Sequence, residues 1–132
     1  MIIGVGTDIV EVKRMEAALA RRGEALARRL LHPEEFSLWQ EKQASAAWLA
    51  KRFAAKEALL KALGTGLGRG LSWQHMCVLP NAFGRPEVTW DSAVLQHLPS
   101  MHLGQLRTHL SISDERDYVL AFAVLEQLEV SG

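Results

Sequence analysis

The chain has 132 residues, of which 48% are hydrophobic and 23% charged, and its formal net charge is zero. This length fits one globular domain, which we expect to span residues 1–132, and the balanced charge argues against binding to nucleic acid or to anionic membranes. The single cysteine, Cys77, excludes an internal disulfide. The N-terminal segment lacks signal-peptide features and no stretch is long enough for a transmembrane helix, so we expect a cytoplasmic protein.

The first half of the chain is predicted to be one strand followed by helices. Residues 1–7 are β-branched and punctuated by glycine, which is typical of a short buried strand, and Asp8 is expected to close it. Gly23 and Gly64 suit helix C-termini, and Pro33 suits a first helical turn. The helices expected from these signals run up to Arg22, over 24–31, over 34–42, and from Ala46 to Leu63.

The second half changes to the alternating pattern of strands. Residues 107–113 and 118–128 read as two strong strands joined by 114–117 in a hairpin. Weaker strands are expected over 72–80 and 86–90, and a short helix over 91–98, with Asp91 as its cap. Because helices and hairpins are mixed rather than strictly alternating, the pattern predicts an α+β fold in which an antiparallel sheet packs on one long and several shorter helices.

The main helix, 46–63, carries charged residues among apolar ones. Glu57 and Lys61 lie four residues apart at the border of two apolar faces, where they could form a simple helix-stabilising ion pair or face a cleft. Arg52 and Lys56 fall within the arc of large side chains, where their charged ends could reach water or could converge with Glu57 and Lys61 on a cleft. The opposite face is small enough for another element to approach closely, and it consists of Ala54, Ala55, Ala58 and Ala62.

Glycine occurs at every second position after this helix, at 64, 66, 68 and 70. Such a loop can adopt positive φ angles and wrap a phosphate with its N–H groups. It is neither a P-loop nor a dinucleotide-binding fingerprint, because Lys61 precedes the glycines and the segment leaves a helix instead of opening one. A mobile loop at a helix end is the commoner explanation.

Asp8 is a second candidate for chemistry. An acidic residue before a helix is usually an N-cap that stabilises the helix by about 1 kcal/mol. However, Asp8 at a strand end and Glu57 on a buried helix are the minimum needed for a magnesium site, since magnesium takes one or two protein carboxylates and completes its shell with water and phosphate oxygens. The sequence leaves open whether the two residues meet.

Four segments together resemble the holo-acyl-carrier-protein synthases, the short 4′-phosphopantetheinyl transferases. They are GVGTDIVEVKR (4–14), LAKRFAAKEALLKALGTG (49–66), FGRPEV (83–88) and LSISDERDYVLAFAVLE (110–126). The likeness covers essentially the whole chain, in order. It implies the 4′-phosphopantetheinyl transferase fold and an enzyme that moves the phosphopantetheine arm of coenzyme A onto a serine of an apo acyl carrier protein, releasing 3′,5′-ADP. It also implies a homotrimer with sites between subunits.

The resemblance assigns roles to residues at matching positions. Asp8 and Glu57 would hold Mg²⁺, and Glu57 or a water that it orients would accept the serine proton. The other implied contacts are those of Lys61, Gly64 and Gly66 with phosphate oxygens, of Arg52 with the 3′-phosphate, and of Pro86 with the adenine. One position departs from a common family form, because Ser113 is followed by Asp114 where many members have histidine. No nucleotide contact is therefore assigned to Asp114.

A basic segment lies near the N-terminus, where residues 11–31 contain six basic and three acidic side chains. Such a face suits an acidic partner, although a solvated helix face is an equally good explanation. Because acyl carrier proteins are acidic, we expect the carrier to dock on Arg14 and Arg21, which share one stripe of a helix. Two alternatives to the enzyme remain: a coenzyme A-binding regulatory module without catalysis, and a structural partner of an acidic protein.

Overall fold

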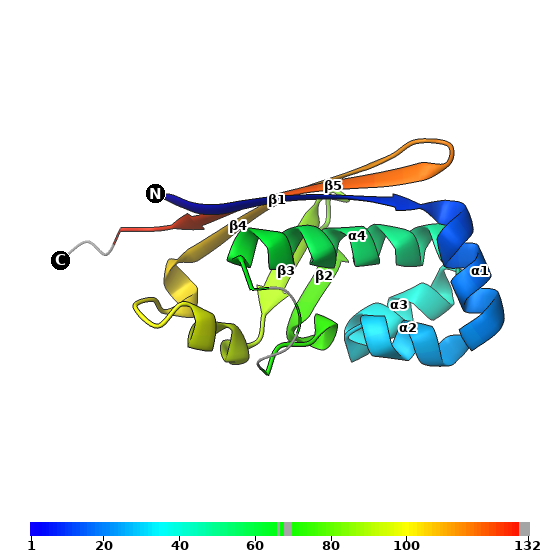
Figure 1. The fold of residues 1–132 in the computed structure, drawn as a ribbon, viewed down its shortest axis with the longest axis horizontal. Helices are drawn as coiled ribbons and strands as arrows, with labels where there is room; N and C mark the ends of the chain where they lie inside the picture. The colour runs from blue at the N-terminus through cyan, green and yellow to red at the C-terminus, as the bar shows by residue number, and fades with distance from the viewer. Residues whose placement is uncertain (66, 68–69, 130–132) are drawn as a thin grey trace.

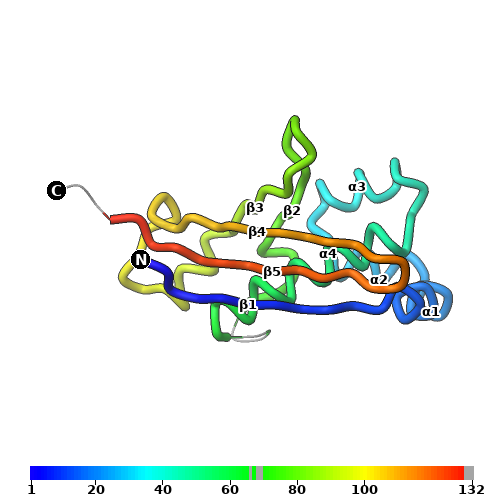
Figure 2. The backbone as a smooth tube through the Cα atoms, turned by 90° about the horizontal axis from the view of Figure 1, so that it is seen from above, coloured from blue at the N-terminus to red at the C-terminus, as the bar shows by residue number. Residues whose placement is uncertain are grey.

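The computed structural model describes residues 1–65, 67 and 70–129. A three-stranded antiparallel sheet in the order β1-β5-β4 lies along one long helix, α4, and three shorter helices gather at one end (Figure 1). A separate antiparallel hairpin, β2-β3, extends beyond β4 (Figure 2). The α+β prediction is therefore confirmed. The helices and strands are β1 (Ile2–Glu11), α1 (Val12–Arg22), α2 (Glu24–Leu30), α3 (Pro33–Glu41), α4 (Ala46–Leu63), β2 (Met76–Pro80), β3 (Pro86–Trp90), β4 (Leu106–Asp114) and β5 (Tyr118–Gln127).

The helices follow the capping signals of the sequence closely. Gly23 ends α1 with a φ of 64°, and Gly64 ends α4 in the left-handed region with a φ of 80°. Pro33 occupies the first turn of α3, where its missing N–H costs nothing. Two segments differ from the prediction: Trp73–His75 forms a 3₁₀ turn before β2, and Ser92–His97 is a 3₁₀ helix, which Asp91 caps as expected.

Strand β1 is longer than the sequence pattern predicted. Asp8 neither closes the strand nor caps the next helix, because it lies within β1, opposite Ala121 of β5. The ladder continues to Glu11 opposite Tyr118, because the residues after Asp8 are also β-branched and find partners along β5. Glu11 stands at the N-cap of α1 without a side-chain capping bond. The carboxylate of Asp8 is therefore free of the capping role.

The small face of α4 packs directly on β1, as the alanine pattern predicted. A Cβ atom added to Gly6 would lie 2.0 Å from the carbonyl oxygen of Ala58, and one added to Gly4 would lie 1.8 Å from that of Ala62. Strand and helix therefore touch backbone to backbone, which requires glycine on one side and alanine on the other. This close approach brings Asp8, two residues further along the same face of β1, next to α4.

We predict that Gly6→Ala destabilises the protein by about 1–3 kcal/mol, the usual cost of forcing extra volume into a packed core. The atom that the new methyl group meets belongs to the helix backbone, which cannot rotate away. Urea unfolding measures the effect, and Gly104→Ala is the matched control because a Cβ there meets nothing within 4 Å. Equal midpoints for both variants would contradict the close packing.

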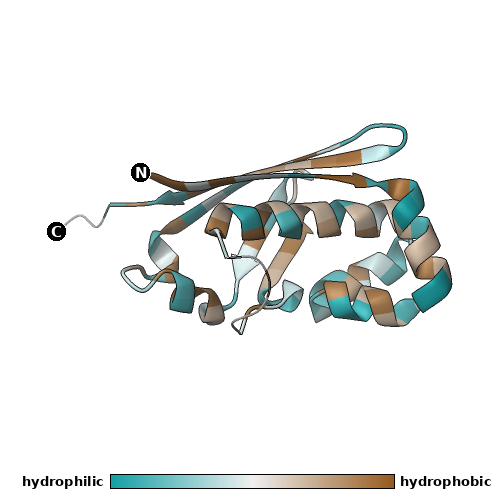
Figure 3. Ribbon diagram, in the orientation of Figure 1, coloured by the Kyte–Doolittle hydropathy of each residue, from teal (hydrophilic) through white to brown (hydrophobic). Residues whose placement is uncertain are grey.

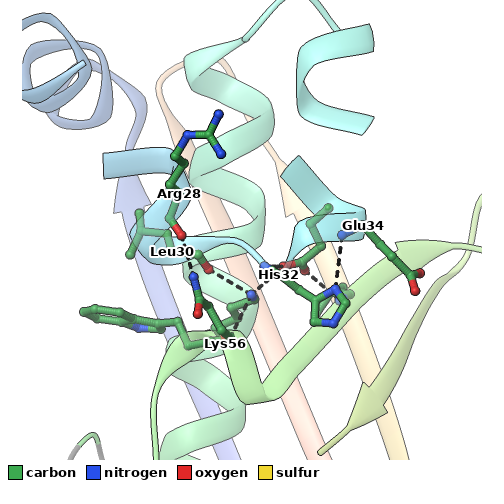
Figure 4. A network of polar contacts seen from close by, with 9 residues as sticks. Arg28, Leu30, His32, Glu34 and Lys56 are labelled. Atoms are coloured by element: carbon green, nitrogen blue, oxygen red, sulfur yellow. Dashed lines mark hydrogen bonds and ion pairs between the residues drawn. The ribbon is translucent and has the colours of Figure 1, made fainter. Parts of the chain in front are cut away.

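A buried ion pair joins the helical end of the molecule to the hairpin. Lys56 is fully buried, and its Nζ donates to Glu35 Oε1 at 2.5 Å, to the Leu30 carbonyl at 2.8 Å and to the Trp73 carbonyl at 2.9 Å (Figure 4). Three donors meeting three acceptors fit the charged ammonium. The pKa of Lys56 is lowered, because the effect of burial outweighs the opposing effect of the neighbouring Glu35 carboxylate. The interpretation in which the charged end of Lys56 extends into water is therefore wrong.

The outer face of the sheet is largely apolar along β1 and β5 and polar along β4, and no element of the described chain covers it (Figure 1). The register places Ile9 beside Leu120 and Val5 beside Val124 on this face. In Figure 3, brown marks the hydrophobic residues along β1, one of the strands that form this surface. Exposed fractions are 51% for Val5, 60% for Ile9, 48% for Leu120 and 45% for Phe122. Among the described residues, no helix is long and apolar enough to cross a membrane.

Candidate active site

A cavity of about 640 Å³ lies where β1 meets α1, α2 and α4. Asp8 from β1 and Glu57 from α4 both line it, so the structure brings together the two carboxylates that the sequence could not connect. Trp73, in the 3₁₀ turn before β2, closes one side. The remaining lining residues are Ile9, Val10, Glu11, Arg14, Met15, Ala18, Arg22, Leu26, Arg29, Leu30, Phe53 and Tyr118.

Asp8 is paired with Lys61, not with a helix N-terminus. The Lys61 ammonium donates to Asp8 Oδ1 at 3.0 Å and to the carbonyl of Thr7 at 2.8 Å. The Asp8 side chain is largely buried, whereas that of Lys61 is more than half exposed. The Lys61 ammonium thus lies beside the Asp8 carboxylate on the solvent side, where a ligand could contact it.

Glu57 does not form the ion pair with Lys61 that helical spacing allowed. Its Oε1 instead accepts a hydrogen bond of 2.9 Å from the indole Nε1 of Trp73, 16 positions further along the chain. The Trp73 ring lies against Phe53, with ring centroids 6.1 Å apart. Glu57 is therefore held by an aromatic residue that carries no charge, and its own negative charge is not neutralised by this contact.

The cavity has a basic side. Arg14 and Arg22 of α1 and Arg29 of α2 line it, and all three are exposed. Arg21 lies in the last turn of α1, is also exposed, and does not line the cavity. The structure thus places Arg14 next to the carboxylates and leaves Arg21 further along the same helix. Cationic groups beside an acidic pair suit a ligand that carries phosphate or carboxylate.

Arg52 lies away from this cavity. Its guanidinium is stacked over the Trp48 ring, 4.1 Å from the ring centroid, and only 6% of the residue is exposed. The pKa of Arg52 is lowered, because the effect of burial outweighs the opposing effect of the Glu35 charge. Arg52 Nε is buried and has no hydrogen-bond partner among the described residues. The interpretation in which the charged end of Arg52 extends into water is therefore wrong.

Pro86 lies at a second cavity of about 480 Å³, between β3 and the sheet. His109, Ser111 and Phe122 line the same cavity, and Asp8 and Glu57 do not. Within one chain, therefore, the structure does not bring Pro86 to the carboxylates. Gly64 ends α4 next to the turn that carries Lys61, and Gly66 lies outside the described residues.

Asp114, at the position where many members of the resembling family have histidine, forms an ion pair within the chain. Asp114 Oδ2 lies 3.2 Å from Lys51 Nζ, so its negative charge is balanced within the chain.

The single cysteine, Cys77, is buried and does not belong to the site. Burial, followed by the charges of Glu35 and Glu34, raises the pKa of Cys77 to about 11, which keeps its thiol protonated and unreactive near neutral pH.

Sequence reasoning missed two features of the site. Arg22 and Arg29 line the cavity beside Arg14, and only the net charge of residues 11–31 pointed toward them. Nothing in the sequence indicated that Trp73 would bind Glu57, because the contact depends on where the chain returns after the glycine loop. The described residues contain no group of three or more His, Cys, Asp or Glu side chains that could hold a metal. A metal in this cavity would therefore take at most two such side chains of the described residues as ligands, and Asp8 and Glu57 are the candidates.

The comparisons with known proteins agree on one family. The sequence model of the 4′-phosphopantetheinyl transferase superfamily matches residues 4–123. The chain is 45% identical to the holo-[acyl-carrier-protein] synthase of Shewanella oneidensis over 125 residues, which cover 95% of this chain and 97% of the relative.

Solved structures give the same result. The crystal structure of the holo-[acyl-carrier-protein] synthase from Neisseria meningitidis is similar with a TM-score of 0.86 and 42% identity, covering 96% of this chain and all (100%) of that one. A holo-(acyl-carrier-protein) synthase from Bacillus anthracis, in complex with CoA (3′,5′-ADP), is similar with a TM-score of 0.79 and 31% identity, covering 96% of this chain and 98% of that one. The chain belongs to the 4′-phosphopantetheinyl transferase superfamily.

Proposed function

We propose that the protein is a holo-acyl-carrier-protein synthase, which transfers the 4′-phosphopantetheine arm of coenzyme A to a serine of an apo acyl carrier protein. The serine oxygen bonds to the phosphorus that carries the arm, the bond from this phosphorus to the bridging pyrophosphate oxygen breaks, and 3′,5′-ADP leaves. One observation carries the proposal: in a chain that matches the transferase superfamily, Asp8 and Glu57 line one cavity and Lys61 binds Asp8. The names of the relatives support it.

The proposal includes Mg²⁺ held by Asp8 and Glu57. Their chemistry fits, because magnesium prefers oxygen ligands, takes one or two protein carboxylates and leaves its other positions to water and phosphate. Lys61 lies 3.0 Å from Asp8, so this carboxylate already accommodates a positive charge beside it. When bound, the ion would neutralise charge on the coenzyme A pyrophosphate.

The chain's own residues have separate tasks in the proposed reaction. Glu57, or a water that it orients, accepts the proton of the carrier serine. Lys61, with its exposed ammonium, holds a phosphate oxygen through a charge-assisted hydrogen bond. Gly64 and Gly66 belong to the loop that we assign to the phosphates. A single transferase domain over residues 1–132 and a cytoplasmic location remain predictions of the proposal.

We further propose that the enzyme is a homotrimer with its active sites between subunits. Arg52 would then contact the 3′-phosphate through the small part of it that is exposed, and Pro86 would contact the adenine, from the subunit next to the one that supplies Asp8 and Glu57. Two observations support this arrangement. Arg52 and Pro86 lie outside the carboxylate cavity of their own chain. The part of the outer sheet face that β1 and β5 form, with Ile9 among its residues, is largely apolar and uncovered in the described chain, as expected of a surface that packs against another copy.

The function is tested by mixing the protein with Mg²⁺, coenzyme A and an apo acyl carrier protein and measuring the intact mass of the carrier. We expect the carrier to gain one phosphopantetheine group, and the gain to disappear when EDTA replaces the metal. Binding of coenzyme A without any change in carrier mass would favour the regulatory module instead. Binding of the carrier alone would favour a structural partner.

The basic helix α1 gives a prediction about the carrier. Arg14→Glu combined with Arg21→Glu should raise the KM for the carrier by at least about tenfold while leaving the affinity for coenzyme A near normal, because long-range attraction to an acidic partner is replaced by repulsion. The effect should shrink at high salt. Steady-state kinetics at low and high salt measures both constants, and Lys42→Glu, an exposed charge reversal after α3, is the control. An unchanged carrier KM would place docking elsewhere.

A further inference from the structure

We propose that Trp73 is a positioning residue that fixes the carboxylate of Glu57 for metal binding and proton transfer. The inference rests on the proposed function and adds a residue to it. Its starting point is the hydrogen bond of 2.9 Å from Trp73 Nε1 to Glu57 Oε1, which lies at the wall of the cavity that both residues line. A carboxylate on a helix otherwise rotates freely about its last bonds, and one directed donor selects a single orientation.

Trp73 is itself held at both ends by consecutive residues of α4. Its indole N–H binds Glu57, and its main-chain carbonyl accepts a hydrogen bond of 2.9 Å from the buried ammonium of Lys56. Lys56 is in turn fixed by its ion pair with Glu35. Because α4 positions both Lys56 and Glu57, the tryptophan forms a brace on the same helix that carries the carboxylate. Because both contacts are to α4, the indole N–H keeps its position relative to the Glu57 carboxylate when the helix moves.

The ring of Trp73 is also fixed in its plane. Phe53 packs against it at a centroid distance of 6.1 Å, and the guanidinium carbon of Arg29 lies 5.7 Å from the centroid of the ring. Both neighbours line the cavity. The N–H vector is thus determined by packing as well as by its acceptor, which is what a positioning group requires.

The chemistry of the indole suits this task. Indole N–H is a donor only, so it takes no proton from the serine and offers no lone pair to a metal. The indole carries no charge, so it leaves the negative charge of Glu57 available to a cation. An ion pair with Lys61, which helical spacing allowed, would have partly neutralised that charge. Outer hydrogen-bond partners of ligating carboxylates typically change metal affinity or activity by about 10–100-fold when removed.

The test is Trp73→Phe, which keeps an aromatic ring against Phe53 and the main-chain contact to Lys56 but removes the N–H. We expect Mn²⁺, used as the probe, to bind about tenfold or more weakly in electron paramagnetic resonance titrations, with coenzyme A present and no carrier, so that no turnover occurs. Added Mg²⁺ should largely restore kcat. The melting temperature should stay within a few degrees of the unmodified protein.

Trp39→Phe is the matched control, because it also deletes a bonded indole N–H, which donates to the Ser45 carbonyl at 3.0 Å. It should leave the Mn²⁺ affinity unchanged. If Trp73→Phe does not fold, a benzothienyl-alanine at position 73 removes the N–H and keeps the bicyclic ring. Unchanged Mn²⁺ affinity in either variant overturns the inference. A failure of the function itself is seen separately, as an unmodified protein that leaves the carrier mass unchanged.

Discussion

Replacing Glu57 by glutamine is expected to reduce phosphopantetheine transfer by at least about a hundredfold. A bound metal contributes several kcal/mol of charge stabilisation in the transition state, and each ~1.4 kcal/mol corresponds to a tenfold change in rate. The amide keeps the size of the side chain and an oxygen acceptor for Trp73, so the change removes the charge and little else. Asp8→Asn should have a similar effect, because Asp8 lines the same cavity.

The measurement is single-turnover transfer at saturating coenzyme A, followed by the mass of the carrier protein. Circular dichroism and the melting temperature establish that each variant is folded. Glu41→Gln, at the exposed end of α3, is the control for loss of a carboxylate outside the site and should transfer normally. If folded Glu57→Gln keeps near-normal magnesium-dependent transfer, the assignment of the two carboxylates is wrong.

Much of the fold could be predicted because its signals are local. The bounds of α4 from Ala46 to Leu63 follow from a serine before the helix and a glycine after it, and both act within a few residues. The alanine face of α4 likewise predicted a close neighbour. The end of β1 was predicted wrongly because strand length depends on a partner: Asp8 remains in the ladder only because β5, more than a hundred positions away, continues beside it.

The site shows the same division between local and distant information. Asp8, Glu57 and Lys61 were singled out by charge among apolar residues and by family resemblance. What held them could not be predicted, since Trp73 reaches Glu57 and Lys61 reaches Asp8 through tertiary contacts. Helical spacing favoured a Glu57–Lys61 pair, and the fold replaced it with two separate contacts.

Lys56 is the clearest case in which a general expectation failed. Its replacement is also the second change for which we expect a large effect, in this case on the free energy of unfolding. A lysine within an apolar arc normally extends its charged end to solvent. Here α2, α3 and the 3₁₀ turn before β2 close over it, and Glu35 supplies the opposite charge. Glu35 also accepts hydrogen bonds from the main-chain N–H groups of His32 and Val78. The pair therefore satisfies four backbone groups in four separate segments.

We predict that Lys56→Met lowers the free energy of unfolding by about 3–5 kcal/mol, the usual cost of removing one partner of a buried ion pair. The loss has two sources, because Glu35 is left buried with an unpaired charge and the carbonyls of Leu30 and Trp73 lose their donor. Guanidinium unfolding at neutral pH, followed by circular dichroism, measures it. Lys51→Met is the matched control on the same helix, since its partner Asp114 is exposed and such pairs contribute about 0–1 kcal/mol.

Combining Lys56→Met with Glu35→Gln separates the two sources of the loss. Removing the charge of Glu35 should recover part of the stability, because no buried charge is then left alone, whereas the carbonyls of Leu30 and Trp73 stay unpaired. The double variant should therefore lie between Lys56→Met and the unmodified protein. Were Lys56→Met no less stable than Lys51→Met, the buried pair would not be what joins the helices to the hairpin, and the brace that Trp73 forms on Glu57 would need another anchor.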